Sequence, residues 1–209
     1  MDPRARASLQ AMLPLLILLG AAEGRPLFYW GARPPVVTAE ASPSAGAAEA
    51  SVTEVHAALE PKGLVVRFSF DRPARDAMRL PDGTPVSGRL RAVLYLDTDD
   101  ERQTGLDQGP LDPRTGSEGR LEVGVVSVGE DPEEKRAASA LLTVTLSSLL
   151  RDGRRKTVWR ADAEGNPSEV SAHGEWVEVR IPASALEPRA PLRLVLAEGN
   201  RAFEGRLPR

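Results

Sequence analysis

The chain has 209 residues, a formal net charge of -3 at pH 7 and 4% aromatic residues. This length is enough to bury one core, while the small net charge excludes general nucleic-acid binding by electrostatics, and the low aromatic content argues against a carbohydrate site built from many stacked rings. The chain has no cysteine, which excludes a disulfide framework, a thiolate zinc site and a cysteine nucleophile.

The first 22 residues have the layout of a secretory signal peptide. Arg4 and Arg6 precede an apolar run at 9–22, which ends in the small residues that a signal peptidase reads. The run is shorter than the roughly 20 apolar residues of a membrane span. The alternative is an uncleaved anchor, because aromatic residues at 28–30 follow closely and such residues favour the bilayer interface. We therefore predict a secreted or periplasmic protein, anchored to the membrane by this segment if the segment is retained.

Residues 23–50 predict a flexible linker. From Arg33 onward this segment is rich in Pro, Ala, Ser and Glu. Such a composition cannot bury enough apolar surface to offset the entropy lost on ordering. The sequence thus divides into a signal peptide at 1–22, a disordered Pro/Ala-rich linker at 23–50 and a folded domain at 51–209.

The folded domain reads as short strands separated by turn residues, which is typical of an antiparallel β-sandwich. Residues 63–70 place apolar side chains at alternate positions, so that one face of the strand is apolar. The same alternation recurs at 90–96, 121–125, 142–146, 157–160, 176–181 and 191–196. An Asp-Gly pair at 152–153 predicts a hairpin turn, and residues 182–186 favour a single helical turn. We predict an all-β fold of about eight strands.

The stretch after the strand at 90–96 is the most informative part of the chain. Four carboxylates occupy five positions there, and the loop closes with Thr104-Gly105; the four are Asp97, Asp99, Asp100 and Glu101. Like charges at this spacing repel one another unless water or a bound cation offsets them. Calcium takes several oxygen ligands from flexible loops. Asp97, Asp99 and Glu101 alternate, so their side chains can point to a common centre.

This loop does not match the EF-hand template. Position six would be Arg102 instead of Gly, and position twelve would be Gln108 instead of Glu. A cation therefore needs a further ligand, and Glu118 is the best candidate because the following strand can bring it back beside Asp97. The weaker alternatives are Asp107 and Asp112. The competing interpretation is a solvated acidic loop that holds no ion.

Two neighbouring runs, 94–105 and 116–123, resemble a known family. The first holds an Asp-Thr-Asp motif and ends in Thr-Gly, and the second opens with Gly-Ser-Glu. Together they resemble the carbohydrate-binding family 9-like domains, relatives of DOMON-type sandwiches, in which an Asp-x-Asp-x-(Asn/Asp)…Thr-Gly loop precedes a Gly-x-Glu segment. Residues 174–186 resemble the penultimate strand of these domains, and residues 63–70 resemble an early strand. The resemblance covers most of residues 51–200.

The resemblance implies a β-sandwich with a structural calcium ion, of the kind appended to secreted enzymes or surface proteins. It assigns the ligands to Asp97, Asp99 and Glu101 in the loop, with Glu118 from the next strand. Glu101 departs from the Asn or Asp that the family has there. The family also stacks sugars on a pair of aromatic rings, and the candidates for a ligand platform are Trp159 and Trp176.

No catalytic motif stands out. The chain has neither a Gly-x-Ser-x-Gly elbow nor a His-Glu-x-x-His helix, and its two histidines lie in unrelated contexts. We therefore expect a protein that is not an enzyme: an exported, calcium-stabilised binding module whose ligand is a glycan. The alternative is an envelope-associated structural or protein-interaction domain with a purely structural ion. Nucleic acid is not expected as a partner, and the membrane is expected only through the N-terminal segment if it is uncleaved.

Overall fold

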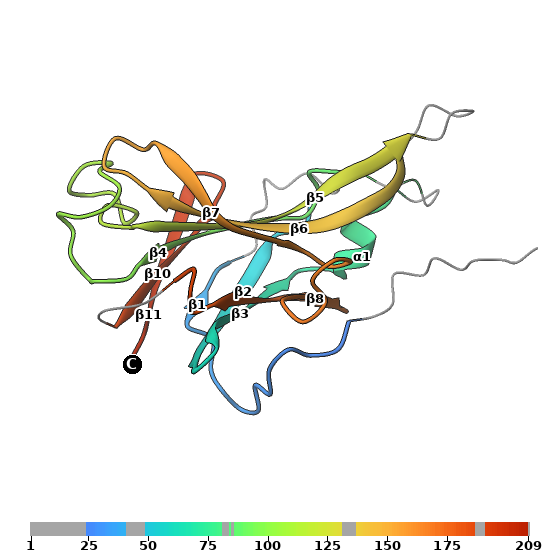
Figure 1. Cartoon of the computed structure of the whole chain (residues 1–209), viewed down its shortest axis with the longest axis horizontal. Coiled ribbons are helices and arrows are strands. Elements are labelled where there is room, and N and C mark those ends of the chain that lie inside the picture. Colours follow the sequence, from blue (N-terminus) through green and yellow to red (C-terminus); the bar gives the residue numbers. More distant parts are fainter. Residues whose placement is uncertain are drawn as a thin grey trace, which may run out of the picture.

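The computed structural model describes residues 24–40, 49–80, 84, 86–130, 137–186 and 191–208. Two antiparallel sheets face each other, as Figure 1 shows. The five-stranded sheet has the order β1 (Val37–Thr38), β2 (Val52–Glu60), β3 (Gly63–Phe70), β9 (Trp176–Pro182) and β8 (Val170–His173). The six-stranded sheet has the order β11 (Arg201–Leu207), β10 (Leu192–Glu198), β4 (Arg91–Asp97), β5 (Gly119–Glu130), β6 (Ala137–Leu149) and β7 (Arg155–Asp162).

The predicted all-β sandwich is confirmed, with eleven strands in the described residues where the sequence predicts about eight. The additional strands carry little periodic signal. β1 has two residues and β8 has four, and β11 alternates between half-buried and exposed positions, with only Phe203 and Leu207 packed against the core. Short or solvated strands of this kind cannot be recognised from apolar alternation.

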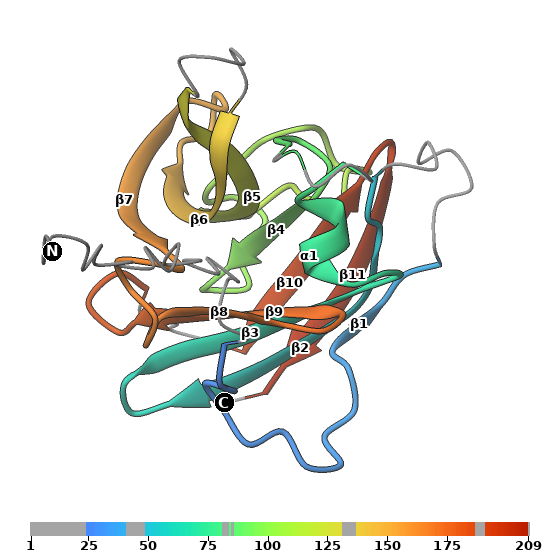
Figure 2. The same ribbon diagram turned by 90° about the vertical axis from the view of Figure 1, so that its right-hand side faces the viewer.

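The core lies between the sheets, where the alternating apolar residues of both inner faces meet. Side chains at every second position of β3, β4 and β9 are buried there, as are those of the long β5–β6 hairpin. Figure 2, an end-on view, shows the six-stranded sheet arching over the flatter five-stranded one. β1 closes one side against β11, where a Cβ on Gly205 would lie 2.0 Å from the carbonyl oxygen of Val36. Only glycine permits this approach.

The flexible linker expected at 23–50 is wrong for residues 24–40, which lie against the sandwich. In Figure 1 this segment runs beneath the five-stranded sheet. Trp30 is 5% exposed and packs on Ala58 and Val65 of the outer face, while Val37 belongs to β1 and enters the main core. The overall composition of the segment conceals two short apolar pieces, at 27–30 and 36–39, which supply enough buried surface to hold it. Residues 41–48 lie outside the described part of the chain, as does the signal peptide predicted at 1–22.

The local predictions at two turns have different outcomes. The hairpin turn at Asp152-Gly153 is confirmed, because Leu150 donates its N–H to the carbonyl of Arg154 at 2.9 Å and Gly153 has a φ of 82°. The helical turn expected at 182–186 is a single hydrogen-bonded turn without a helix. In the described residues the only helix is α1 (Ala74–Ala77), and none is long and apolar enough to cross a membrane.

Candidate metal centre

Three of the predicted carboxylates meet where β4 ends and β5 begins. These strands are antiparallel neighbours with Leu96 opposite Gly119, so Glu118 arrives beside the end of β4. One carboxylate oxygen from each of Asp97, Asp99 and Glu118 lies within 4.8 Å of the others. Glu101 is not a member of this group, because its side chain is exposed and only its backbone carbonyl faces the loop interior.

The loop after β4 is shaped by its own aspartates. Asp97 Oδ1 accepts hydrogen bonds from the backbone N–H groups of Asp99 at 3.3 Å and Asp100 at 2.7 Å. Asp99 Oδ1 accepts the N–H of Glu101 at 3.0 Å. Such Asx turns explain why aspartate recurs in the loop. Asp100 has a φ of 58°, in the left-handed region that aspartate tolerates better than most residues.

Glu118 joins this loop from the next strand. Its Oε2 accepts the N–H of Thr98 at 2.7 Å, and its Oε1 lies 2.7 Å from the Thr104 hydroxyl. That hydroxyl also lies 3.1 Å from Asp99 Oδ1 and 2.8 Å from the carbonyl of Glu101. Because a hydroxyl has one proton to donate, two of these three oxygens face it without a donated hydrogen. The lone pairs of several oxygens are therefore turned toward one small volume.

Gly105 is required for the loop to close. It has a φ of 56°, and a Cβ added to it would lie 2.3 Å from the carbonyl oxygen of Ser117. Any other residue would meet both a strained backbone and a direct clash. The Thr-Gly pair of the sequence thus has two separate tasks: Thr104 supplies an oxygen, and Gly105 supplies the turn.

Sequence reasoning missed Arg193, which lies beneath the carboxylates. Arg193 is opposite Asp97 in the β10–β4 pairing. Its Nε donates a hydrogen bond to Asp97 Oδ2 at 2.8 Å, its Nη2 lies 2.7 Å from the same oxygen, and the two side chains are 2% and 1% exposed. The same guanidinium donates to the carbonyls of Pro113 and Thr115, each at 2.7 Å. One buried cation therefore ties both arms of the 97–118 loop to the sheet.

The charge of the three clustered carboxylates is only partly cancelled by Arg193. Arg193 offsets one of the three clustered carboxylates, which leaves two formal negative charges when all three are ionised. Burial raises the pKa of Glu118, and the charges of Asp97 and Asp99 act in the same direction, whereas hydrogen bonds from Thr98 and Thr104 lower it. The available donors are carboxylate, hydroxyl and carbonyl oxygens, the ligands that calcium takes. The residues therefore fit a hard divalent cation.

The two tryptophans do not form a pair. Trp159 is on β7 and packs against the main core. Trp176 is on β9 of the other sheet and is half-buried, with the guanidinium of Arg67 4.7 Å and the ring of His173 5.2 Å from its centroid. The two rings therefore come from different sheets, and both are partly covered.

The outer face of β9 around Trp176 is also covered. Strand alternation does place Glu178 on the outer face of β9, but it is completely buried. Its carboxylate accepts hydrogen bonds from the indole of Trp30 and the N–H of Leu27, and from Arg67 at 2.7 Å. The N-terminal segment therefore occupies the surface that alternation alone assigns to solvent.

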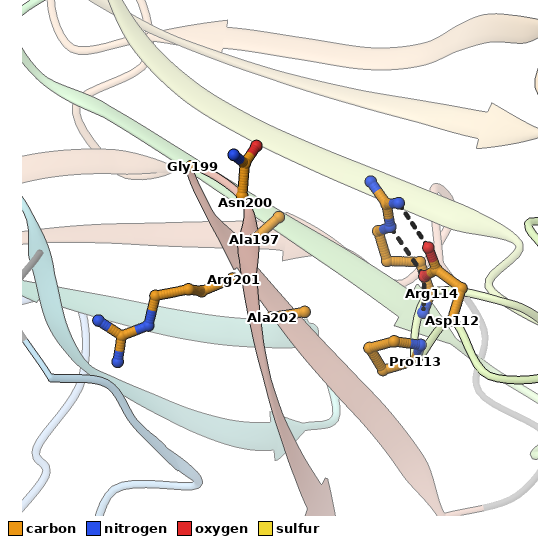
Figure 3. A pocket seen from close by; sticks show the side chains of 8 residues that line it. All are labelled: Asp112, Pro113, Arg114, Ala197, Gly199, Asn200, Arg201 and Ala202. Atoms are coloured by element: carbon orange, nitrogen blue, oxygen red, sulfur yellow. Dashed lines mark hydrogen bonds and ion pairs between the residues drawn. The ribbon is translucent and has the colours of Figure 1, made fainter. Parts of the chain in front are cut away.

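Two open hollows lie over the six-stranded sheet. The first encloses about 400 Å³ between the 112–114 segment and the β10–β11 turn. Figure 3 shows Asp112 and Arg114 paired on one side of it, while Arg201 points away from them toward the other. Arg201 contacts Glu40 at 3.4 Å. The second hollow, of about 390 Å³, adjoins the first at Arg114, Ala197 and Gly199.

Comparison of the chain with known protein families, with curated proteins and with solved structures gave no match. The likeness to carbohydrate-binding family 9-like domains therefore rests on the short motifs of the sequence.

Proposed function

We propose that this protein is an exported, non-catalytic binding module whose acidic loop is braced by calcium. The observation that carries the proposal is the convergence of Asp97, Asp99 and Glu118 where β4 meets β5. The ion would have an architectural role, holding the loop at 97–118 against the sheet beside the contact that Arg193 makes. A cation that binds only the folded chain stabilises it by mass action.

The signal peptide predicted at 1–22 supports export. It would deliver the chain to a compartment in which calcium is plentiful, and extracellular modules hold calcium with dissociation constants of about 10⁻⁴ to 10⁻³ M. A site with three carboxylates, one of which also serves Arg193, suits binding in that range.

A binding role is favoured by the hollows over the six-stranded sheet. In the first of them Arg114 is paired with Asp112, and Arg201 is directed toward Glu40. A catalytic site needs titratable groups that converge on one reacting centre, whereas these groups are engaged in separate pairs. Polar, open hollows with many donors and acceptors suit the hydroxyl groups of a glycan, which we propose as the ligand class.

A glycan screen of the full chain tests this proposal. We expect binding to a restricted set of glycans in the presence of calcium, and weaker binding with a chelator because the loop at 97–118 borders the first hollow. The full chain is needed because residues 24–40 are part of the folded unit. Binding to none of the glycans, with or without calcium, would rule out a glycan as the ligand.

The second candidate is an envelope-associated domain that contacts another protein. It is favoured by three exposed apolar side chains on the six-stranded sheet, Val126, Val128 and Val158, which are 44%, 42% and 45% exposed. Isolated apolar side chains are common on surfaces, but apolar positions on the solvent side of a sheet also mark protein interfaces. Loss of a captured envelope protein on changing Val126 and Val128 to Ser, combined with a silent glycan screen, would favour this candidate.

A further inference from the structure

We propose that the second hollow, which lies over β4 and β5, is the ligand-binding site. We propose that its ligand is a saccharide bearing a single carboxylate, such as a uronate unit. This inference rests on the proposed binding function and adds to it both a place and a chemical class. It is carried by the guanidinium groups that line this hollow and by the way in which they are held.

The hollow has a mostly polar lining, with a few apolar side chains on its floor. Val93 of β4 lies opposite Ala197 of β10, and Tyr95 lies opposite Arg120 of β5. The small side chains of Val93 and Ala197 leave open the space that larger residues would fill. The resulting volume of about 390 Å³ is within the range of roughly 300–1,000 Å³ that is typical of small-molecule sites. A floor with an aromatic ring beside aliphatic groups suits the apolar face of a sugar.

Four guanidinium groups surround this floor, from Arg89, Arg91, Arg114 and Arg120. Glu122 accepts hydrogen bonds from Arg120 and, at 2.9 Å, from Arg91. Asp112 accepts two from Arg114, from Nε at 2.9 Å and from Nη2 at 2.5 Å. Each of these three arginines is thus oriented by a neighbouring carboxylate that does not itself line the hollow. The remaining N–H groups of Arg91 and Arg120 contact no acceptor among the described residues. The Arg91 side chain is 60% exposed and the Arg120 side chain 10%, so Arg91 is the more accessible donor for a ligand.

The charge balance selects the kind of anion. Glu49 and Glu198 also line the hollow, and with Glu122 and Asp112 they match the four arginines in number. The hollow therefore lacks the strong positive field that a nucleic acid or a polysulfated chain would need. Oriented guanidinium donors recognise one planar carboxylate through paired hydrogen bonds instead. Glu49 and Glu198 can accept hydrogen bonds from neighbouring hydroxyl groups.

The first hollow, which adjoins this one, gives such a ligand room to continue. It shares Arg114 with the second hollow and adds the amide of Asn200, which Figure 3 shows beside Ala197. Because the Arg114–Asp112 pair carries no net charge, the first hollow suits an uncharged sugar unit. A short oligosaccharide with one carboxylated residue would fill both spaces.

The test compares a galacturonate trisaccharide with the matched galactose trisaccharide, by calorimetric titration of the full chain in calcium. We expect the uronate to bind at least about tenfold more tightly, an order set by one charge-assisted pair of hydrogen bonds. The variants Arg91→Gln and Arg120→Gln should each weaken uronate binding about tenfold and leave binding of the galactose trisaccharide unchanged. Arg91 is 60% exposed, so its replacement does not endanger folding.

Arg154→Gln is the matched control. Arg154 is likewise exposed and paired with one carboxylate, Asp152 at 2.6 Å, but lies outside the hollow. Its replacement should leave uronate affinity unchanged. Equal affinity for the two trisaccharides, or an Arg91→Gln variant as tight as the native chain, would overturn this inference and spare the proposed function if other glycans bind. Inorganic phosphate binding as tightly as the uronate, and losing affinity in Arg91→Gln, would also overturn it by showing a simple anion seat.

Discussion

The guanidinium of Arg193 holds the carboxylate of Asp97 at 2.7 and 2.8 Å, in a place where water reaches neither side chain. The contact joins β10 to the end of β4 and, through the carbonyls of Pro113 and Thr115, to the far arm of the acidic loop. Part of the bracing that the sequence assigns to calcium is therefore supplied by the protein itself. In our account calcium binds the cluster of Asp97, Asp99 and Glu118, in which Asp99 and Glu118 carry the charge that Arg193 does not neutralise.

The first prediction concerns this buried pair. Replacing Arg193 by Met leaves Asp97 as a buried charge without its partner, which should cost about 3–5 kcal/mol of folding free energy. Denaturant unfolding followed by circular dichroism measures this cost. Arg206 serves as the control, because it pairs with Asp100 of the same loop at 3.1 Å but is 59% exposed. Arg206→Met should cost no more than about 1 kcal/mol, and equal losses in the two variants would show that Arg193 is not a brace.

The second prediction concerns the N-terminal segment. If residues 24–40 belong to the folded unit, Trp30→Ala removes a buried ring and should destabilise the chain by about 3–5 kcal/mol. Its neighbour Tyr29 is 89% exposed, so Tyr29→Ala should change stability by less than about 0.5 kcal/mol. Thermal melting of the two variants beside the native chain decides the matter. A Trp30→Ala variant as stable as Tyr29→Ala would show that residues 24–40 are a linker and not part of the folded unit.

The third prediction concerns the pH dependence of stability. Burial raises the pKa of Glu198, and the charges of Asp71 and Glu49 act in the same direction, whereas a hydrogen bond from the backbone N–H of Val52 opposes the shift. The folded chain therefore holds this proton more tightly than the unfolded chain does. The contribution of Glu198 to stability is present below the ordinary carboxyl value of 4.5 and is lost as the pH rises through the raised pKa.

Glu198→Gln removes this dependence. Its unfolding free energy should fall less steeply than that of the native chain as the pH rises above about 4.5. Melting curves taken at closely spaced pH values would show the difference. Parallel curves for the two proteins, or a steeper fall in the variant, would contradict the assigned direction.

Apolar alternation was sufficient to predict both inner faces of the sandwich. The side chains of β3, β4, β5, β6 and β9 that alternate in the sequence are those that form the core. Alternation is a property of one strand at a time, so it survives without knowledge of the partner strands. The meeting of Asp97 and Glu118 was predictable for a related reason, since consecutive antiparallel strands return the chain to the same edge.

Arg193 and the covered face around Glu178 were not predictable in this way. The Arg193–Asp97 contact depends on the register between two strands that are almost a hundred residues apart in the chain, and no local pattern sets that register. For Glu178, alternation correctly assigns the outer face of β9. It cannot reveal that Leu27 and Trp30 return across that face and bury the carboxylate.

Calcium-dependent melting tests the central claim most directly, that Asp97, Asp99 and Glu118 hold an ion. At a calcium concentration of 100 times the dissociation constant, the native chain should gain about 2.7 kcal/mol, a rise in Tm of roughly 5–10 °C for a chain of this size, and lose it with a chelator. Asp99→Asn and Glu118→Gln should abolish most of the rise, whereas Glu101→Gln, whose exposed carboxylate lies outside the group, should keep it. A native chain whose Tm responds to neither calcium nor chelator would contradict the account.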